Sequence, residues 1–572
     1  MVRHLRCEAR GAPLLDLRAV TGAATGAHVR RRRPAIATVV AGLIVVGFVA
    51  VCTVDISRPG VEYDEALFLN AATGAHGGDA FIYRRLFGHP LLLMSYIGAL
   101  KAYLFYPIFR VFGVSALTIR LPVILLTAAA LVGTYLLARR LFGGRVAAVL
   151  LLVVASEPAL IFTTRTDWGP VVLMTFFKVM ALNGLFLFLR DGRVRWLLLL
   201  YGSLLAGIYD KLNFLWFVAA LLVATPLALW PELRERSREL RSRGVLSSNV
   251  VFAGLAALMV AAFLPAALHD VNGGPLDLRQ RFADVRQLFT TTFDGSVVYG
   301  WMTARNLAFT AWTPWLVLPA AVGGLVAAVA RVVPARVRNP EARRDLRIAL
   351  FFALLFAVTF AEMVATRSAT GPHHVMTLWA FTAFSIAAAL RAAWRALPPH
   401  AVRPRWAVAA IVAAATVAVT ASQVAVDAEF VAAFHGNNSF NAPWSPAIYP
   451  LSDLLEGRIA GADEVVTVDW GMGNQLYGFA SAADRPKYHD LWVLFQLLDP
   501  ASPDAPAVRQ AFFAGRRVLV VLHAPGNVTF PQARAHFMAF AAESGIALGR
   551  PQVVRDPAGL PVFLVYDLDV AS

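Results

Sequence analysis

Eleven apolar runs, most of them close to the length that crosses a bilayer, limit this chain to few possible folds. A helix needs roughly 20 apolar residues to span the hydrocarbon core of a membrane. The runs are 34–54, 121–138, 146–162, 170–189, 196–209, 213–230, 249–268, 308–330, 348–366, 375–390 and 406–425. Hydrophobic residues make up 58% of the chain and charged residues 15%, which excludes an ordinary soluble enzyme. We expect a polytopic α-helical membrane protein.

The arginines predict how the runs are oriented, because positive charge marks the cytoplasmic side. The N-terminal tail, 1–33, ends in four consecutive arginines. Every second loop after it carries at least three arginines, namely 139–145, 190–195, 231–244, 331–347 and 391–405. We therefore expect a cytoplasmic N-terminus and an extracytoplasmic C-terminus. Because only four of the 52 basic residues are lysines, which suggests a GC-rich bacterial genome, the expected location is the bacterial inner (plasma) membrane. Orientation also accounts for the net charge of +16, so no nucleic-acid partner is expected.

Residues 81–119 are almost apolar enough to form a further span, but Lys101 and Pro107 interrupt the apolar stretch. If this segment crossed the membrane, every later arginine-rich loop would lie outside. Its aromatic and basic side chains are typical of amphipathic helices that lie at a membrane surface. We expect such helices on the outer face, within an outer loop at 55–120.

After the last run the composition changes, and residues 426–572 predict a soluble α/β domain outside the membrane. The expected strands are 464–470, 516–524 and 561–568, and the expected helices are 505–514 and 530–544. The two cysteines, Cys7 and Cys52, lie elsewhere, so the domain should fold without disulfides. We expect it to capture an acceptor or to cover an outer cavity, and not to carry the catalytic groups.

Ionisable residues gather in the loops predicted to face outward. Glu62, Asp64 and Glu65 follow the first run, and three carboxylates so close together repel one another unless cations or a ligand compensate. The later outer loops add further polar side chains, namely Arg165, Asp167, Lys211, Arg367, His373 and His374. Each of these could be a solvated loop residue or part of a salt bridge. Their convergence on one face predicts a site that opens outward.

Such a site has a limited range of chemistry. A carboxylate beside a cation stays ionised and can accept a proton from a hydroxyl. Arginine and lysine match a phosphate group. One base and a phosphate clamp are what the transfer of a sugar from a lipid phosphate requires, because the leaving phosphate is a weak base and needs no general acid.

The chain resembles the GT-C membrane glycosyltransferases, in the branch of the protein O-mannosyltransferases (glycosyltransferase family 39) and the aminoarabinose lipid A transferases. The resemblance covers roughly 35–230. It is carried by Asp64-Glu65, Phe112-Gly113, Arg120-Leu121, Tyr135, Arg139 to Gly143, and Arg165 to Asp167. It implies a GT-C-like fold over 34–425, a polyprenyl-phosphate sugar as donor, Asp64 as the catalytic base and inversion at the sugar.

The other site residues have expected roles as well. Glu65 would support Asp64 or contact the acceptor, and Asp167 would lie in the substrate site. Arg165, Lys211, Arg367, His373 and His374 would hold the donor phosphate. No cofactor is expected and no metal ligand is assigned, because adjacent histidines diverge whereas metal ligands on a helix stand at i and i+4. The need for a divalent metal stays open.

The partners follow from the same resemblance. They are a lipid-linked sugar donor in the membrane and an extracytoplasmic protein, lipid or glycan acceptor. The alternative function is a transporter or flippase of lipid-linked sugars, and a third is an inactive scaffold. A transporter would need polar residues near the middle of the spans, where the sequence places only Lys178.

Overall fold

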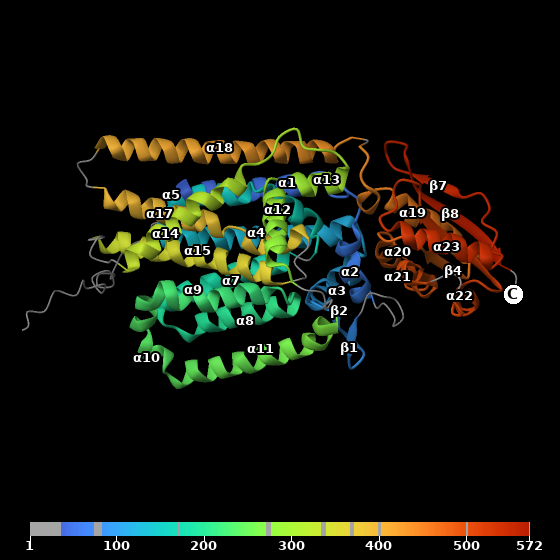
Figure 1. The fold of residues 1–572 in the computed structure, drawn as a ribbon, viewed down its shortest axis with the longest axis horizontal. Helices are drawn as coiled ribbons and strands as arrows, with labels where there is room; N and C mark the ends of the chain where they lie inside the picture. Colours follow the sequence, from blue (N-terminus) through green and yellow to red (C-terminus); the bar gives the residue numbers. More distant parts are fainter. Residues whose placement is uncertain are drawn as a thin grey trace, which may run out of the picture.

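A computed structural model describes residues 36–73, 83–169, 171–269, 276–332, 339–366, 371–397, 402–436, 438–498 and 502–570. It has an elongated body of helices with an α/β domain at one end (Figure 1). Helix α2 (Tyr63–Thr73) and helix α3 (Leu100–Phe112) lie between these two parts. The predicted polytopic helical fold with a C-terminal α/β domain is confirmed.

The helical body contains the predicted runs. Within the described ranges, nine helices are long and apolar enough to cross a membrane, or ten if one bent pair is a single span. Seven of them are α1 (Ile36–Thr53), α4 (Ala116–Phe142), α7 (Val172–Asp191), α9 (Phe214–Glu235), α11 (Arg243–His269), α15 (Pro340–Ala365) and α18 (Val402–Phe434). The other two are longer stretches, Thr313–Ala330, which contains most of α14 (Val317–Val332), and Pro372–Ala396, which ends with α17 (Phe381–Ala396). The predicted run 196–209 falls on α8 (Val194–Asp210), which has 17 residues.

The run predicted as one span at 146–162 is broken. It forms α5 (Gly144–Ala155) and α6 (Pro158–Thr166), which meet at an angle of 63°. Pro158 opens α6 and lacks the N–H that a continuous helix would need at that point. The break turns α6 towards the end of the body that carries α2, and α6 contains Arg165.

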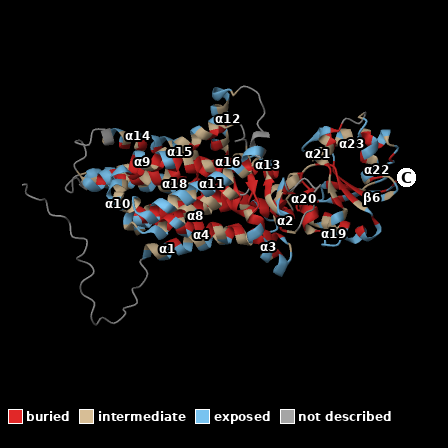
Figure 2. Ribbon diagram, turned by 90° about the horizontal axis from the view of Figure 1, so that it is seen from below, coloured by how far each residue is buried: buried red, intermediate tan, exposed pale blue. Residues whose placement is uncertain are grey.

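Burial distinguishes the centre of the body from its periphery. In the most apolar 18-residue stretch of α7, 78% of the residues are buried, whereas 6% are buried in the corresponding stretch of α11 and 17% in those of α1 and α18. Figure 2 shows the buried residues running through the body and on into the α/β domain. The exposed apolar faces of the peripheral helices fit a lipid environment, because lipid is the solvent that such side chains prefer.

The segment between α1 and α4 differs in part from the prediction. Amphipathic helices were expected over 81–119, but the chain first forms a small antiparallel sheet of β1 (Arg84–Leu86), β2 (His89–Met94) and β3 (Ile97–Gly98). Phe87 and Gly88, both with positive φ, form the tight turn between the first two strands. Helix α3 follows and is amphipathic as expected, with Ala102, Phe105 and Phe109 buried on one face.

Further helices complete the body. They are α10 (Ser237–Leu240), α12 (Leu278–Phe293), α13 (Ser296–Thr303), η1 (Thr313–Leu316), α16 (Pro372–Val375) and η3 (Met376–Leu378). Of these, η1 and η3 fall within the predicted runs 308–330 and 375–390, and the others were not predicted. Asp277 caps α12 by accepting hydrogen bonds from two backbone N–H groups of its first turn.

The α/β domain is built on a five-stranded sheet in the order β5-β4-β6-β8-β7. The strands are β4 (Glu464–Thr467), β5 (Tyr488–Asp490), β6 (Arg516–His523), β7 (Gln552–Arg555) and β8 (Pro561–Val570). The helices are α19 (Ile448–Arg458), α20 (Gly473–Phe479), α21 (Trp492–Leu497), α22 (Ala505–Phe512) and α23 (Pro531–Glu543). The three predicted strands and two predicted helices are present, while the short β5 and β7 were missed.

Alternating apolar side chains give this sheet a core on each face. Val465 and Leu519 pack on one face, and Val466 and Val520 pack on the other. The domain begins later than predicted, because α18 continues past residue 426 to Phe434. Cys52 is a free, buried thiol in α1, and Cys7 lies outside the described residues.

Candidate active site

A buried ion pair fixes the start of α2. Both carboxylate oxygens of Glu65 accept hydrogen bonds from the Arg120 guanidinium, at 2.7 and 2.8 Å. Arg120 also donates to the carbonyls of Ile56, Pro59 and Gly60 in the loop before α2. Both side chains are 0% exposed. Glu65 therefore positions the helix and its preceding loop, and it does not reach a substrate.

The three neighbouring carboxylates are each compensated differently. Burial raises the pKa of Glu62 well above its usual value, with the charge of Asp64 as the second cause. Glu62 also accepts hydrogen bonds from the backbone N–H groups of Asp64 (2.7 Å) and Glu65 (3.3 Å). With Glu65 bound to Arg120 and Glu62 buried beside α2, Asp64 is the least buried of the three.

Asp64 faces a cationic and aromatic environment. Burial raises the pKa of its carboxyl, while the charge of Lys211 and a hydrogen bond with Trp168 lower it. Lys211 is itself fixed in place, since its Nζ donates to the carbonyl of Gly169 at 2.6 Å and lies 5.8 Å from the centre of the Tyr96 ring. Burial lowers the pKa of Lys211 to about 8, against the opposing charges of Asp210, Asp64 and Asp167. Lys211 is thus protonated at neutral pH.

The two histidines belong to the same cluster. The His373 and His374 ring centres are 4.1 Å apart, and the His373 ring lies 5.6 Å from that of Trp168. The charge of Lys211 acts on both rings. Within the described part of the chain, His373 Nδ1 and both ring nitrogens of His374 have no hydrogen-bond partner. These buried polar atoms can bind an incoming group.

The backbone of Gly169 lies against this cluster. Its φ is +61°, and a Cβ atom there would overlap with the His373 ring. Only glycine adopts that conformation without cost and leaves the histidine its space. Gly169 therefore sets how closely Lys211 and His373 approach each other.

Arg165 does not face the cluster. Its guanidinium nitrogens donate to the carbonyls of Cys52 (3.1 Å), Arg58 (2.7 Å) and Asp55, and its Cζ atom lies 4.0 Å from the centre of the Phe434 ring. The expected phosphate contact of Arg165 finds no support, because these partners hold the side chain against the loop after α1.

Asp167 also has a structural position. It forms a buried ion pair with Lys101 of α3, and its other oxygen accepts hydrogen bonds from the N–H groups of Val171 (3.1 Å) and Val172 (3.0 Å). It thereby caps α7 and ties α3 to it. Sequence reasoning treated Lys101 only as an interruption, although a lysine within an apolar stretch is a signal for a buried partner.

The remaining expectations concern Arg367 and metals. Arg367 lies outside the described residues. In the ranges that the structure describes, no three His, Cys, Asp or Glu side chains are grouped as a metal ion would require.

Trp168 completes the cluster around Asp64 and the histidines. Trp168 is 3% exposed and packs against Trp301, Trp444 and Phe162 as well as His373. It forms the apolar wall of the cluster. Its position directly after Asp167 was the sequence signal for this role.

Comparisons with known proteins agree with this architecture. Residues 98–269 match the family model described as dolichyl-phosphate-mannose-protein mannosyltransferase. The crystal structure of ArnT from Cupriavidus metallidurans in the apo state is similar over 93% of this chain and 98% of that chain, at 17% identity and a TM-score of 0.52. The chain has the GT-C fold. The resemblance stated from the sequence is therefore confirmed.

Other GT-C structures are similar at lower scores. ArnT from C. metallidurans bound to undecaprenyl phosphate is 16% identical over 93% of this chain and 98% of that chain, with a TM-score of 0.47. The apo oligosaccharyltransferase of Archaeoglobus fulgidus is 12% identical over 84% of this chain and 69% of that chain, with a TM-score of 0.48. No curated protein sequence matches the chain.

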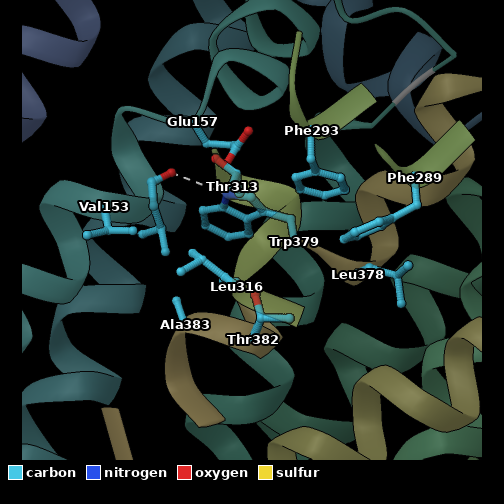
Figure 3. Close-up of a pocket in the computed structure, with 12 residues that line it drawn as sticks. Val153, Glu157, Phe289, Phe293, Thr313, Leu316, Leu378, Trp379, Thr382 and Ala383 are labelled. Atoms are coloured by element: carbon cyan, nitrogen blue, oxygen red, sulfur yellow. Dashed lines mark hydrogen bonds between the residues drawn. The ribbon is translucent and has the colours of Figure 1, made fainter. Parts of the chain in front are cut away.

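Two ionisable residues inside the GT-C helical body lie apart from the cluster. Glu157, at the break between α5 and α6, accepts a hydrogen bond from Gln423 at 3.2 Å and lines a cavity beside Thr313 and Trp379 (Figure 3). Lys178 donates to the carbonyls of residues 376, 377 and 379, in the turn that follows the histidine pair. Lys178 therefore stabilises that turn. These hydrogen bonds give it a structural role and do not support a role in transport.

Proposed function

We propose that this protein is a membrane glycosyltransferase that moves a sugar from a polyprenyl-phosphate donor to a hydroxyl of an extracytoplasmic acceptor. The observation that carries the proposal is one cluster in which the Asp64 carboxylate, the Lys211 ammonium and the two histidines meet around Trp168. ArnT, whose apo form has the same fold, has also been solved with undecaprenyl phosphate, and this supports a lipid-phosphate donor.

In the proposed reaction, Asp64 takes the proton of the acceptor hydroxyl. The hydroxyl oxygen attacks the anomeric carbon from the face opposite the phosphate, and the bond from that carbon to the phosphate oxygen breaks. The new glycosidic bond has inverted configuration, and polyprenyl phosphate leaves with the bonding electrons. Lys211 and the unpartnered histidine nitrogens would stabilise its negative charge.

The surrounding contacts favour Asp64 over the other carboxylates. Glu65 is held by Arg120, and Asp167 is held by Lys101 and the start of α7. Burial favours the protonated form of Glu62. Asp64 alone among these four is partly exposed, so it can meet a substrate.

The test uses membranes that contain the protein and a radiolabelled polyprenyl-phosphate sugar. Asp64→Asn should lower incorporation of label into envelope material by about 10²- to 10⁴-fold, the contribution of a general base, while the protein level stays unchanged. Asp453→Asn, at an exposed position on α19, is the matched control and should transfer normally.

Two results would contradict the proposal. One is normal transfer by Asp64→Asn. The other is movement of labelled lipid between leaflets by the reconstituted protein with no consumption of the donor, which would favour the transporter.

A further inference from the structure

The order of the strands in the α/β domain reverses direction at β4, and such a reversal marks the ligand-binding edge of open α/β sheets. Strand β4 lies between β5 and β6 and is parallel to both. The chain leaves β4 for β5 on one side and then crosses to β6 on the other. Connections that depart in opposite directions open a crevice at the carboxyl ends of parallel strands, where open α/β sheets bind ligands.

Three aromatic rings follow the carboxyl ends of these strands. Trp470 comes after β4, Trp492 comes after β5, and Phe530 lies in the connection after β6. The Trp492 and Phe530 rings are stacked, with centres 5.3 Å apart and an angle of 14°. Trp470 meets Phe530 edge-on at 5.8 Å. Neither Trp492 nor Phe530 belongs to the hydrophobic cores of the described domain, and Phe530 is 38% exposed.

Carboxylates accompany the rings at the same edge. Asp490 ends β5 and accepts hydrogen bonds from Thr467 Oγ1 (2.7 Å) and from the Tyr63 hydroxyl (3.0 Å). Asp469 follows β4 and is 1% exposed; one oxygen accepts a hydrogen bond from the His523 N–H, and the other has no partner within the described part of the chain.

These carboxylates decide which ligand fits. The Gly471 to Asn474 turn after β4 resembles a phosphate cradle in sequence, but a Cβ at Gly473 would overlap with the Asp490 carboxyl group. A carboxylate at that position repels an anion. Rings that stack on C–H faces, beside carboxylates that accept hydrogen bonds from hydroxyls, suit an uncharged sugar.

The same edge contacts the helix that carries the candidate base. The Tyr63 ring centre lies 5.2 Å from that of Trp470, and Trp492 Nε1 donates to the Tyr63 hydroxyl at 3.1 Å. Asn474 donates to the Tyr63 carbonyl at 3.2 Å, and Figure 1 shows α20 and α21 on the side of the domain that faces α2. Tyr63 directly precedes Asp64 in the first turn of α2.

We infer that Trp470, Trp492, Phe530, Asp469 and Asp490 form a sugar-binding subsite, and that the acceptor offered to Asp64 is a glycan. This inference rests on the proposed function and narrows its acceptor from a protein, lipid or glycan to a carbohydrate. A sugar unit stacked on the rings would place the next unit of the glycan beside the start of α2.

The test measures sugar binding directly on the full-length protein in detergent. The probes are the methyl glycosides of mannose, glucose, galactose and arabinofuranose and their α-linked disaccharides, observed by saturation-transfer NMR. At least one probe should bind, and Trp492→Ala and Phe530→Ala should each weaken its binding about tenfold. Trp492→Phe keeps a stacking ring and should bind within about twofold of the parent. The matched control is Trp406→Ala, at an exposed tryptophan on α18.

Failure of this inference can be told apart from failure of the proposed function. Asp64→Asn should lose transfer and keep sugar binding; if it keeps both, the proposed function fails alone. Absence of binding by every probe, or equal binding by the parent and the alanine variants, would overturn the subsite. A further result would also overturn the subsite. If brominated lipid in nanodiscs quenches the fluorescence of Trp470 and Trp492, and no sugar reduces that quenching, the rings contact lipid.

Discussion

The Lys211 ammonium donates a hydrogen bond to the carbonyl oxygen of Gly169, 2.6 Å away. This bond ties the turn before α9 to the turn before α7, two segments that meet only through the fold. It also fixes a positive charge that acts on Asp64 and on the histidine pair. Both the activity and the stability of the protein should depend on this arrangement.

The rate of donor consumption should depend on pH in a bell-shaped manner. Asp64 must be ionised to act as a base, and its pKa is raised, so kcat/KM rises with pH on the acid side. Lys211 loses its charge as pH rises through its lowered pKa of about 8, so kcat/KM falls there. Lys211→Arg keeps its charge at higher pH and should move the falling limb upward. If the falling limb of the Lys211→Arg variant lies at the same pH as that of the parent, the titration of Lys211 does not cause the fall.

Gly169→Ala should lower transfer at least tenfold by displacing His373. The substitution forces an L-residue into a left-handed conformation, at a cost of about 1–2 kcal/mol, and places Cβ against the histidine ring. Gly192→Ala is the matched control, because its φ is +68° but its Cβ would meet only the flexible Glu239 side chain at 3.2 Å. Equal losses in both variants would show that backbone strain alone is responsible.

Arg120→Met should destabilise the protein by about 3–5 kcal/mol, because it leaves the Glu65 carboxylate buried without its partner. Thermal unfolding in detergent measures the loss. The double variant Arg120→Met/Glu65→Leu removes both charges and should recover part of the stability. If the losses of stability in Arg120→Met and in Glu65→Leu sum to the loss in the double variant, the two residues are not coupled.

Lys178→Met should weaken donor binding by disturbing the turn after the histidines. Lys178 is the donor to three carbonyls of that turn, and the variant leaves them without this cation. Lys487→Met is the control, because Lys487 donates to the carbonyls of Ile459 and Ala462 in the α/β domain. A photoreactive polyprenyl phosphate measures binding; equal labelling of both variants would contradict the role of Lys178.

Sequence reasoning identified the elements that local patterns specify. Long apolar runs predict helices, and the order of the polar loops along the chain predicts that Asp64, Lys211 and the histidine pair lie on one face. The apolar runs on β4, β6 and β8 predict the α/β domain, whereas β7, of four residues, carries too little pattern to detect.

The roles of Glu65 and Arg165 could not be obtained in this way. Whether a buried cation binds a substrate or backbone carbonyls depends on which distant segment folds against it. The carbonyl partners of Arg165 lie more than 100 residues before it in the chain. The 84–98 sheet was missed for a related reason, because its short strands pair locally around a turn at Phe87 and Gly88 while their composition resembles an interfacial helix.

The contacts between α2 and the α/β domain also impose an order on assembly. The bond from Asn474 to Tyr63 spans 411 residues, and the bond from Tyr63 to Asp490 spans 427. A ribosome makes α2 early and its partners last. The contacts around the helix that carries Asp64 can therefore form only after nearly the whole chain has been synthesised. An incomplete chain in the membrane lacks a complete site. Synthesis itself would keep nascent molecules from acting on the lipid donor.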